Sequence, residues 1–307
     1  MFEIIFLGTS ASAPSIRRGL SAQIVKHDEH RFLVDCGEGT QRQILQSGVG
    51  FKRLNRVLLT HGHLDHILGL GGLVSTLMRW EALDELEIYG GRATLDRVHD
   101  LLYGVVLRGK KPAAKLTLHE VKPGVFFEGK DFIVSAFPVS HRGPDCYGYR
   151  FDEKAHRPFL AEKADELGVP FGPERRDLVN GEAITLADGR RIEPEEVLGS
   201  LIKGASLAIT GDTGKTHNLL DAVNGVDTLV IESTYISQDA EMARKFGHLT
   251  ARQAAELAVQ ARVKRLVLTH LSRRYRVRDV LNEARKFFPE SYVARDFDEY
   301  QVKRDES

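Results

Sequence analysis

The strongest constraint on this chain is a dense group of metal-binding side chains on one short segment. Thr60-His61-Gly62-His63-Leu64-Asp65-His66 follows the apolar stretch Arg56–Leu59, which predicts a strand. Imidazole is a good zinc ligand, and a carboxylate complements it. Loops at strand ends are where open α/β sheets place their ligands. The segment therefore predicts a metal site, and four unrelated surface residues are a poor explanation of so dense a pattern.

Three later residues repeat the same placement, after an apolar strand and a short polar tail. They are His141 after Phe132–Phe137, Asp212 after Ser206–Thr210 and His270 after Arg265–Leu268. Taken singly, a histidine or a Gly-Asp turn is more often structural, but the repetition favours one shared site. Asp35, after the predicted strand Arg31–Val34, is expected to accept a hydrogen bond from a ligand histidine.

Seven ligands suit two metal ions if Asp212 bridges them. We expect His61, His63 and His141 at one ion and Asp65, His66 and His270 at the other. Two ions about 3.5–4 Å apart can hold and activate a water molecule, and Asp65 can also hold that water or accept its proton. Imidazole-rich ligation, with His63 at the second motif position, favours zinc over a redox metal.

Short apolar runs and helical spacings alternate along most of the chain, which predicts a layered α/β architecture. The other expected strands are Glu3–Leu7, Gln23–Lys26, Glu87–Tyr89, Leu116–Val121, Tyr147–Phe151, Thr228–Ile231 and Tyr292–Ala294. The expected helices are Thr40–Gln46, His66–Trp80, Ala251–Arg262 and Val277–Phe288. His27-Asp28-Glu29-His30 is predicted to be a hairpin tip with both histidines on the surface.

Composition limits the class of protein and its partners. In 307 residues, 42% are hydrophobic, so one large domain can bury a sizeable core. Lys plus Arg and Asp plus Glu both number 43, so bulk charge does not hold this chain on nucleic acid. The two cysteines form no disulfide framework. No signal peptide and no run of about 20 apolar residues is present, which favours a cytoplasmic protein without a membrane span.

The segment 154–203 differs from the rest of the chain. It has few strand signals, many turn residues and a mildly acidic balance. We interpret residues 1–307 as a single domain that carries this segment as an inserted arm.

The seven candidate ligands in this order resemble those of the metallo-β-lactamase superfamily, which implies a four-layer αββα sandwich. Within it, the chain resembles the ribonuclease Z family, tRNA 3′-processing endonucleases, in its short form. Five segments outside the ligand motif carry that resemblance: Phe6–Thr9, Asp35–Gln41, Leu268–Tyr275, and in the arm Val169-Pro170-Phe171-Gly172-Pro173 and Asp188-Gly189-Arg190. General members of the superfamily are not expected to carry this arm.

The resemblance implies two Zn²⁺ ions per chain and cleavage of precursor tRNA that leaves a 3′-hydroxyl on the tRNA. It implies a Glu232–His248 proton relay to the leaving oxygen, with Asp65 as the third catalytic residue. It also implies a homodimer in which the arm of one subunit grips tRNA for the active site of the other. The arm residues expected to contact the substrate are Gly172, Pro173, Arg175 and Arg176.

Arg274 belongs to an arginine cluster just after His270. Such a cluster can be a solvated helix start, but beside a metal ligand an arginine can bind phosphate with two hydrogen bonds. Pro14-Ser15-Ile16-Arg17-Arg18-Gly19 keeps only the proline and one arginine of the family loop that reads the tRNA 3′ end. The treatment of CCA-ending tRNAs therefore stays open.

Two other functions compete with tRNA processing. One is a hydrolase of small phosphodiesters or other esters, against which the arm argues. The other is a non-catalytic RNA-binding or scaffold subunit, which the complete set of seven ligands disfavours.

Overall fold

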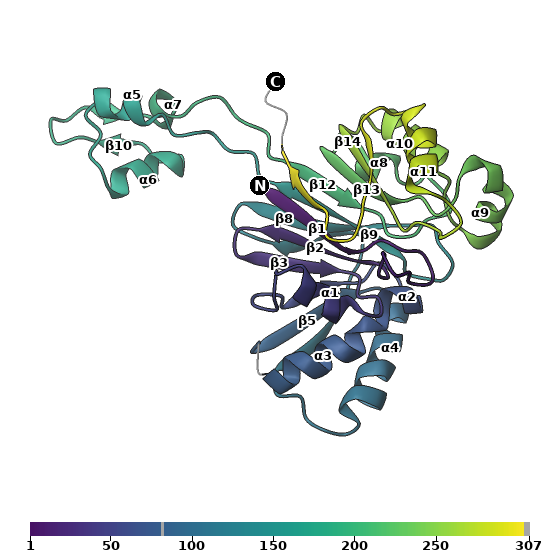
Figure 1. Cartoon of the computed structure of the whole chain (residues 1–307). Coiled ribbons are helices and arrows are strands. Elements are labelled where there is room, and N and C mark those ends of the chain that lie inside the picture. Colours follow the sequence, from purple (N-terminus) through teal and green to yellow (C-terminus); the bar gives the residue numbers. More distant parts are fainter. Residues whose placement is uncertain (81–82, 304–307) are drawn as a thin grey trace. The chain divides into compact units, whose positions relative to one another are not determined.

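Two seven-stranded sheets form the centre of the main unit in the computed structural model, which describes residues 1–80 and 83–303. The first sheet has the order β16-β1-β2-β3-β4-β5-β6 (Figure 1). Its strands are β1 (Phe2–Gly8), β2 (Ala22–His27), β3 (His30–Val34), β4 (Arg56–Leu58), β5 (Glu85–Gly90), β6 (Lys115–Glu120) and β16 (Glu299–Val302). Strands β3 to β6 run parallel, so their carboxyl ends lie at one edge.

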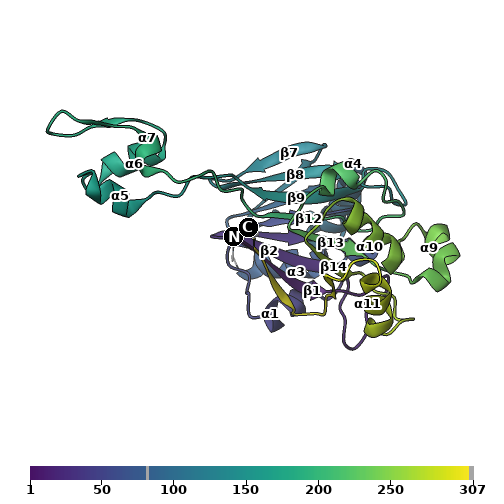
Figure 2. The ribbon, with the colours of Figure 1, turned by 90° about the horizontal axis from the view of Figure 1, so that it is seen from above.

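The second sheet has the order β15-β14-β13-β12-β9-β8-β7, and Figure 2 shows much of it from above. Its strands are β7 (Gly124–Glu128), β8 (Phe132–Pro138), β9 (Tyr147–Glu153), β12 (Ser206–Ile209), β13 (Thr228–Glu232), β14 (Arg265–Thr269) and β15 (Ser291–Val293). Strands β12 to β15 run parallel, which again brings carboxyl ends together.

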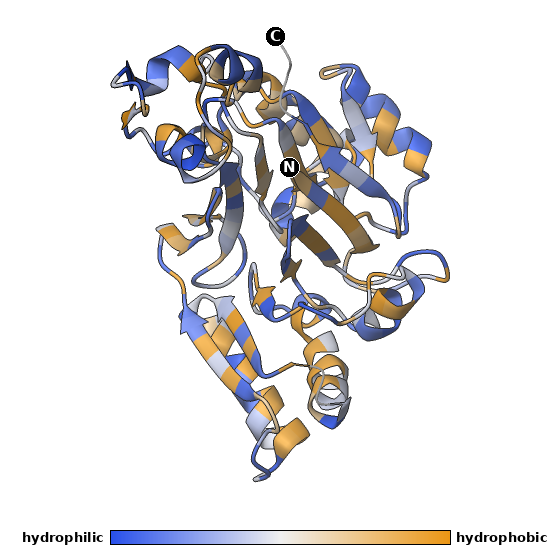
Figure 3. Cartoon of the chain, turned by 90° about the vertical axis from the view of Figure 1, so that its left-hand side faces the viewer, coloured by the Kyte–Doolittle hydropathy of each residue, from blue (hydrophilic) through white to orange (hydrophobic). Residues whose placement is uncertain are grey.

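Side-chain alternation explains why the central strands are apolar on both faces. In β1, Phe2, Ile4 and Phe6 belong to the core between the two sheets. Ile5 and Leu7, which point the other way, belong to the core between the first sheet and its helices. In Figure 3 the strands are accordingly rich in hydrophobic residues, and the helices carry hydrophilic ones on their outer sides.

Helices cover the outer face of each sheet. The first sheet is covered by α1 (Thr40–Gln46), α2 (Leu64–Ile67), α3 (Gly69–Trp80), α4 (Arg92–His99) and the π-helix η1 (Asp100–Leu107). The second is covered by α8 (Leu220–Val223), α10 (Ala251–Gln260) and α11 (Val277–Arg285). The short η2 (Ser237–Asp239) and α9 (Ala240–Phe246) follow β13. The predicted αββα layering is confirmed.

Residues 153–204 form a second compact unit with a small core of its own. Its elements are α5 (Ala161–Glu166), α6 (Pro173–Val179), β10 (Ile184–Thr185), β11 (Arg191–Ile192) and α7 (Pro194–Val197). Its buried side chains are Ala164, Val169, Leu178, Ile184, Ile192 and Val197. The unit is inserted between two paired strands, because Asp152 of β9 lies opposite Ser206 of β12.

The structure corrects one surface assignment and several boundaries. His27 and His30 do flank a hairpin turn, but His27 is only 4% exposed and its ring packs between Phe2 and Phe132. The reason is the period of two, which puts His27 on the same inward face as Val25. The predicted helix 66–80 is divided at Leu68 into α2 and α3, and both later helices end earlier than predicted.

Cys36 and Cys146 are both free and buried. Across residues 1–80 and 83–303, the structure contains no helix with the length and apolar character that a bilayer crossing requires.

The hydroxyl of Tyr149 connects the two sheets just before the metal-binding segment. Tyr149 lies on β9, is fully buried, and donates a 2.6 Å hydrogen bond to the carbonyl of Leu59, the residue after β4. Tyr149→Phe leaves that buried carbonyl without its donor, so we expect a loss of about 1–3 kcal/mol in the free energy of unfolding. Urea denaturation measures the change.

Tyr292→Phe is the matched control, because its hydroxyl bonds the exposed Glu290 and its loss should cost less than about 0.5 kcal/mol. Equal stability of the two variants would mean that Tyr149 does not hold the sheets together at this point.

Candidate functional site

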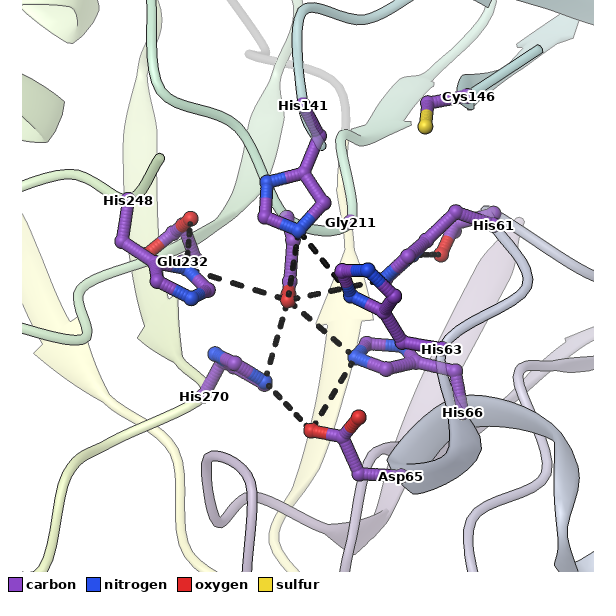
Figure 4. A network of polar contacts seen from close by, with 12 residues as sticks. His61, His63, Asp65, His66, His141, Cys146, Gly211, Glu232, His248 and His270 are labelled. Atoms are coloured by element: carbon purple, nitrogen blue, oxygen red, sulfur yellow. Dashed lines mark hydrogen bonds and ion pairs between the residues drawn. The ribbon is translucent and has the colours of Figure 1, made fainter. Parts of the chain in front are cut away.

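The seven predicted ligand residues lie together where strands of both sheets end. The first sheet contributes the segment after β4, and the second contributes the loops after β8, β12 and β14. Figure 4 shows the imidazoles directed at a common centre. Gly211 permits this approach, since it has a φ of 65° and a Cβ there would lie 2.7 Å from Cβ of Thr60. At the site, the backbone of Gly211 from the second sheet therefore packs directly against the side chain of Thr60 from the first sheet.

The donor atoms form three groups, and within each group they lie within 4.8 Å of one another. The first consists of His61, His63, His141 and Asp212, the second of Asp65, His66 and His270, and the third of Asp212, His248 and His270. The first two correspond to the grouping expected from the sequence, and the third places His248 beside the cluster. His141 Nε2 lies 3.3 Å from His63 Nδ1, so these two rings present their nitrogens to the same point.

Asp212 lies between the first two groups. Its Oδ2 is 3.4 Å from Nε2 of His66 and of His270, and 3.8 Å from Nε2 of His61 and of His141. A carboxylate oxygen in this position can reach both groups, which is what a bridging ligand requires.

Four of the inward-facing histidines are held from behind at their Nδ1 atoms. Asp35 accepts from Thr60 N at 2.8 Å and contacts His66 Nδ1 at 2.7 Å, and the Thr60 hydroxyl lies 3.0 Å from His61 Nδ1. On the other sheet, His141 Nδ1 bonds the carbonyl of Gly247 at 2.8 Å, and His270 Nδ1 lies 2.9 Å from the Thr234 hydroxyl. These contacts leave Nε2 of all four rings facing the centre.

Buried polar atoms without partners show that the cluster fits a cation. Within the described residues, Nε2 of His61, His66 and His270 and Oδ1 of Asp212 are buried and form no hydrogen bond. Burying such atoms unsatisfied is costly, whereas divalent metal ions bound in the cluster would satisfy them. Burial also lowers the pKa of His61, His63 and His141 below the usual value. These rings are therefore neutral near pH 7, the form that binds metal.

Glu232 and His248 form a second, adjacent arrangement. His248 Nδ1 lies 2.8 Å from Glu232 Oε1, and the buried carboxylate also accepts from the backbone N–H groups of Thr213 (2.8 Å) and Leu249 (3.2 Å). Burial disfavours the charged imidazole, but the facing Glu232 carboxylate outweighs it and raises the pKa of His248 to about 9. Thus His248 is a cation at neutral pH, oriented through Nδ1 with Nε2 free of that bond.

A cavity of about 340 Å³ opens onto these groups. Asp65, Asp212 and His248 line it, as does the predicted phosphate-binding residue Arg274. The backbone N–H of Ser12 donates to Asp65 Oδ2 at 2.9 Å from a left-handed conformation with a φ of 59°. A non-glycine residue held there stores strain of the kind found at functional sites.

The arm residues predicted to contact substrate belong to the separate unit. Gly172, with a φ of 152°, and Pro173 begin α6, and both are exposed, as is Arg176. Arg175 instead holds the arm together. Its side chain is 13% exposed, bonds Asp165 and the carbonyls of Val169 and Pro170, and covers the ring of Phe171 at 4.3 Å.

Sequence reasoning predicted one of the residues that support the site, Asp35, and missed three others, Thr60, Thr234 and Gly247. A signal was present for each of the three, since Thr60 directly precedes His61, Thr234 lies two residues after Glu232, and Gly247 directly precedes His248. Their partners come from distant parts of the chain, so their roles are visible only in three dimensions.

Comparisons with known proteins give two family models and several full-length relatives. A family model described as "Anti-Pycsar protein Apyc1" matches residues 2–157, and one described as "Beta-lactamase superfamily domain" matches residues 178–271. The chain is 45% identical over 302 residues to ribonuclease Z of Bradyrhizobium diazoefficiens, with 98% of this chain and 100% of that protein covered. It is 39% identical over 307 residues to ribonuclease Z of Listeria monocytogenes, with 98% and 99% covered.

Solved structures show the same fold. The short form of human tRNase Z aligns with a TM-score of 0.71 at 25% identity, covering 98% of this chain and all of that one. A long-form RNase Z from yeast aligns with a TM-score of 0.65 at 17% identity, covering 98% of this chain and 42% of that one. The predicted metallo-β-lactamase fold is confirmed.

Asp35→Asn tests the support behind the cluster. The amide replaces one accepting oxygen with a donor, so Thr60 or His66 loses its acceptor. We expect zinc affinity to fall about 10–100-fold, measured by competition with a chromophoric chelator. Asp28→Asn is the control, since Asp28 is exposed and has a similar φ of 50°. Unchanged zinc affinity in Asp35→Asn would mean that Asp35 does not orient a ligand.

Proposed function

The chain belongs to the ribonuclease Z family, and from this we propose that it is a zinc-dependent endoribonuclease that removes the 3′ trailer from precursor tRNA. The observation that carries the proposal is the shared cavity. It brings the metal-binding cluster, the Glu232-bound His248 and Arg274 to one place that a phosphodiester can enter.

We assign two Zn²⁺ ions to the cluster, one to His61, His63 and His141 and one to Asp65, His66 and His270, with Asp212 between them. When bound, zinc supplies a water of lowered pKa and offsets the charge that develops on the phosphate. All seven side chains belong to the imidazole and carboxylate classes that suit this metal.

Two side chains of the protein, Asp65 and His248, accept and donate the protons of the reaction. Burial alone would raise the pKa of Asp65, but His270 Nε2 at 3.5 Å and the nearby His66 lower it well below the usual value. Asp65 is thus ionised and accepts the proton of the attacking water. On the other side, His248 donates from Nε2 to the leaving 3′ oxygen while Glu232 holds Nδ1.

Arg274 is assigned to a non-bridging oxygen of the scissile phosphate, which a guanidinium can bind with two hydrogen bonds. Cleavage leaves a 3′-hydroxyl on the tRNA and a 5′-phosphate on the trailer. Ile231 and Leu249, the sequence neighbours of Glu232 and His248, are both buried. The relay needs only the backbone N–H of Leu249, so its side chain is free to pack in the core.

The arm is proposed to bind the tRNA body away from the cut. Its acidic balance argues against binding by bulk charge. Backbone N–H groups near Gly172 and Pro173, together with the exposed Arg176, are the proposed contacts to phosphate.

The enzyme is further proposed to act as a cytoplasmic homodimer. Support for the dimer comes from three exposed leucines. Leu45 on α1, Leu64 on α2 and Leu68 directly after α2 are 53%, 55% and 41% exposed. Leu45 and Leu68 also line one hollow of about 300 Å³. Contiguous exposed apolar side chains are typical of interfaces, and sedimentation equilibrium measures the mass of the assembly.

Cleavage of a 3′-extended precursor tRNA tests the function directly. Zinc-loaded protein should cut just after the discriminator base, and a chelator should stop the reaction. Asp65→Ala should lower kcat/KM about 10²–10⁴-fold and leave tRNA affinity within a few-fold, because the carboxylate acts in the chemical step. Asp96→Ala, at an exposed site on α4, should behave as wild type.

Failure to cut precursor tRNA, together with turnover of bis(p-nitrophenyl) phosphate, would move the natural substrate to small phosphodiesters. An equal loss of binding and cleavage in Asp65→Ala would count against its catalytic role.

Removing the arm separates tRNA processing from small-ester hydrolysis. Because β9 and β12 pair at the base of the insertion, a two-residue Asn-Gly turn can replace residues 154–204. We expect precursor tRNA cleavage to fall at least about 100-fold through a higher KM, and bis(p-nitrophenyl) phosphate turnover to stay within about twofold. Retained tRNA cleavage would refute the assignment of the arm as a tRNA-binding element.

A further inference from the structure

The cavity at the metal cluster has two kinds of wall, and the proposed mechanism uses only one. The polar wall carries His63, Asp65, Asp212 and His248, with Arg142 and Arg274 beside them. The rest of the lining includes three large side chains, Tyr235, Met242 and Phe246, which we call the apolar wall. A phosphodiester group alone does not need an apolar surface. We therefore ask which other part of the substrate contacts the apolar wall.

Helix α9 builds most of this wall. Met242 and Phe246 are four residues apart, so they lie on one face of the helix, while Ala243 is buried in the protein. Phe246 is 37% exposed, although it is a large aromatic residue beside a cavity. Phe246 is therefore accessible from the cavity and is not part of the closed core, whereas Tyr235 is only 8% exposed.

The wall is joined to the reacting groups through the end of α9. The helix stops at Gly247, which has a φ of 71° and whose carbonyl bonds His141 Nδ1 at 2.8 Å. The next residue is His248. Phe246 thus lies two residues before His248, the proposed general acid. The short connection through Gly247 limits the distance between their side chains.

Cations flank the aromatic ring. The guanidinium of Arg142 and the ammonium of Lys245 lie 5.7 Å and 5.8 Å from its centroid. An aromatic surface next to positive charge is the combination that binds a base together with its backbone phosphate. A volume of about 340 Å³ is at the lower end for small-molecule pockets, so it suits one nucleotide and not a helical stem.

We propose that Phe246, with Met242 and Tyr235, forms a stacking site for the base of the nucleotide that carries the leaving 3′ oxygen. His248 donates its proton to that oxygen, so the base attached to the same ribose is the one within reach of α9. This inference rests on the proposed function and adds a specificity element to it. Because every base has a π face, the site demands a base at this position without selecting one sequence.

A double-mutant cycle between protein and substrate tests the proposal. The substrate is a 3′-extended precursor tRNA with an abasic residue at the last retained nucleotide, or at the first trailer nucleotide. Wild type should lose about tenfold in kcat/KM on the first abasic substrate and less than about threefold on the second. Phe246→Ala should lose about tenfold on the intact substrate and nothing further on the first abasic substrate.

Phe246→Trp keeps an aromatic surface and should retain activity within about threefold. Phe287→Ala is the matched control, because Phe287 is also 37% exposed and lies under an arginine, Arg252, at 5.0 Å, yet does not line the cavity. Zinc content is measured for each variant, since Gly247 supports His141. The wild-type enzyme with the two abasic substrates needs no variant, so it remains informative if Phe246→Ala misfolds.

The outcomes separate this inference from the proposed function. If wild type does not cleave intact precursor tRNA, the proposed function fails. If wild type cleaves it but is indifferent to the abasic substitution at the last retained nucleotide, the stacking site is refuted and the nuclease assignment stands. Additive losses from Phe246→Ala and the abasic residue would likewise refute contact between them.

Discussion

The burial of histidine nitrogens and one aspartate oxygen around a single point is the constraint on which the site depends. Such atoms cannot be left without partners in the interior except at a cost of about 1–3 kcal/mol each. Among the described residues, no neighbouring group forms a hydrogen bond to these atoms. The surrounding structure fixes the opposite ring nitrogens through Asp35, Thr60, Thr234 and the Gly247 carbonyl instead. The fold thus stores an unfavourable arrangement that a bound cation relieves.

This arrangement also explains why the two sheets must end together. Neither sheet supplies a complete ligand set, since the segment after β4 and the loops after β8, β12 and β14 all contribute. The Tyr149 hydroxyl joins the sheets at Leu59, two residues before His61, so the spacing of the sheets and the spacing of the ligands are set at the same place. A change in the packing between the two sheets would therefore also change the distances between the ligands.

The sequence predicted which seven side chains lie together, because the predicted strands that precede them are recognisable from a local pattern. Features that depend on distant partners could not be predicted. Strand β16 has the polar sequence Glu-Tyr-Gln-Val and is recognisable only by its pairing with β1, from the other end of the chain. The burial of His27 follows from the inward face of β2, and the apolar wall on α9 from its position beside the cavity. Arg175 shows the same limit, since its contacts within the arm are invisible in a linear pattern.

The insertion of the arm between paired strands has a consequence for folding order. Asp212 reaches the cluster only after β12 pairs with β9, and 53 residues lie between the paired positions Asp152 and Ser206. Closing so long a loop costs about 2 kcal/mol more entropy than closing a turn of a few residues. If the arm folds first and buries its own six core side chains, the flexible part of that loop is reduced to the two segments that connect the arm to β9 and β12. The arm carries none of the ligand residues, yet in this way it influences how fast β9 and β12 of the second sheet pair.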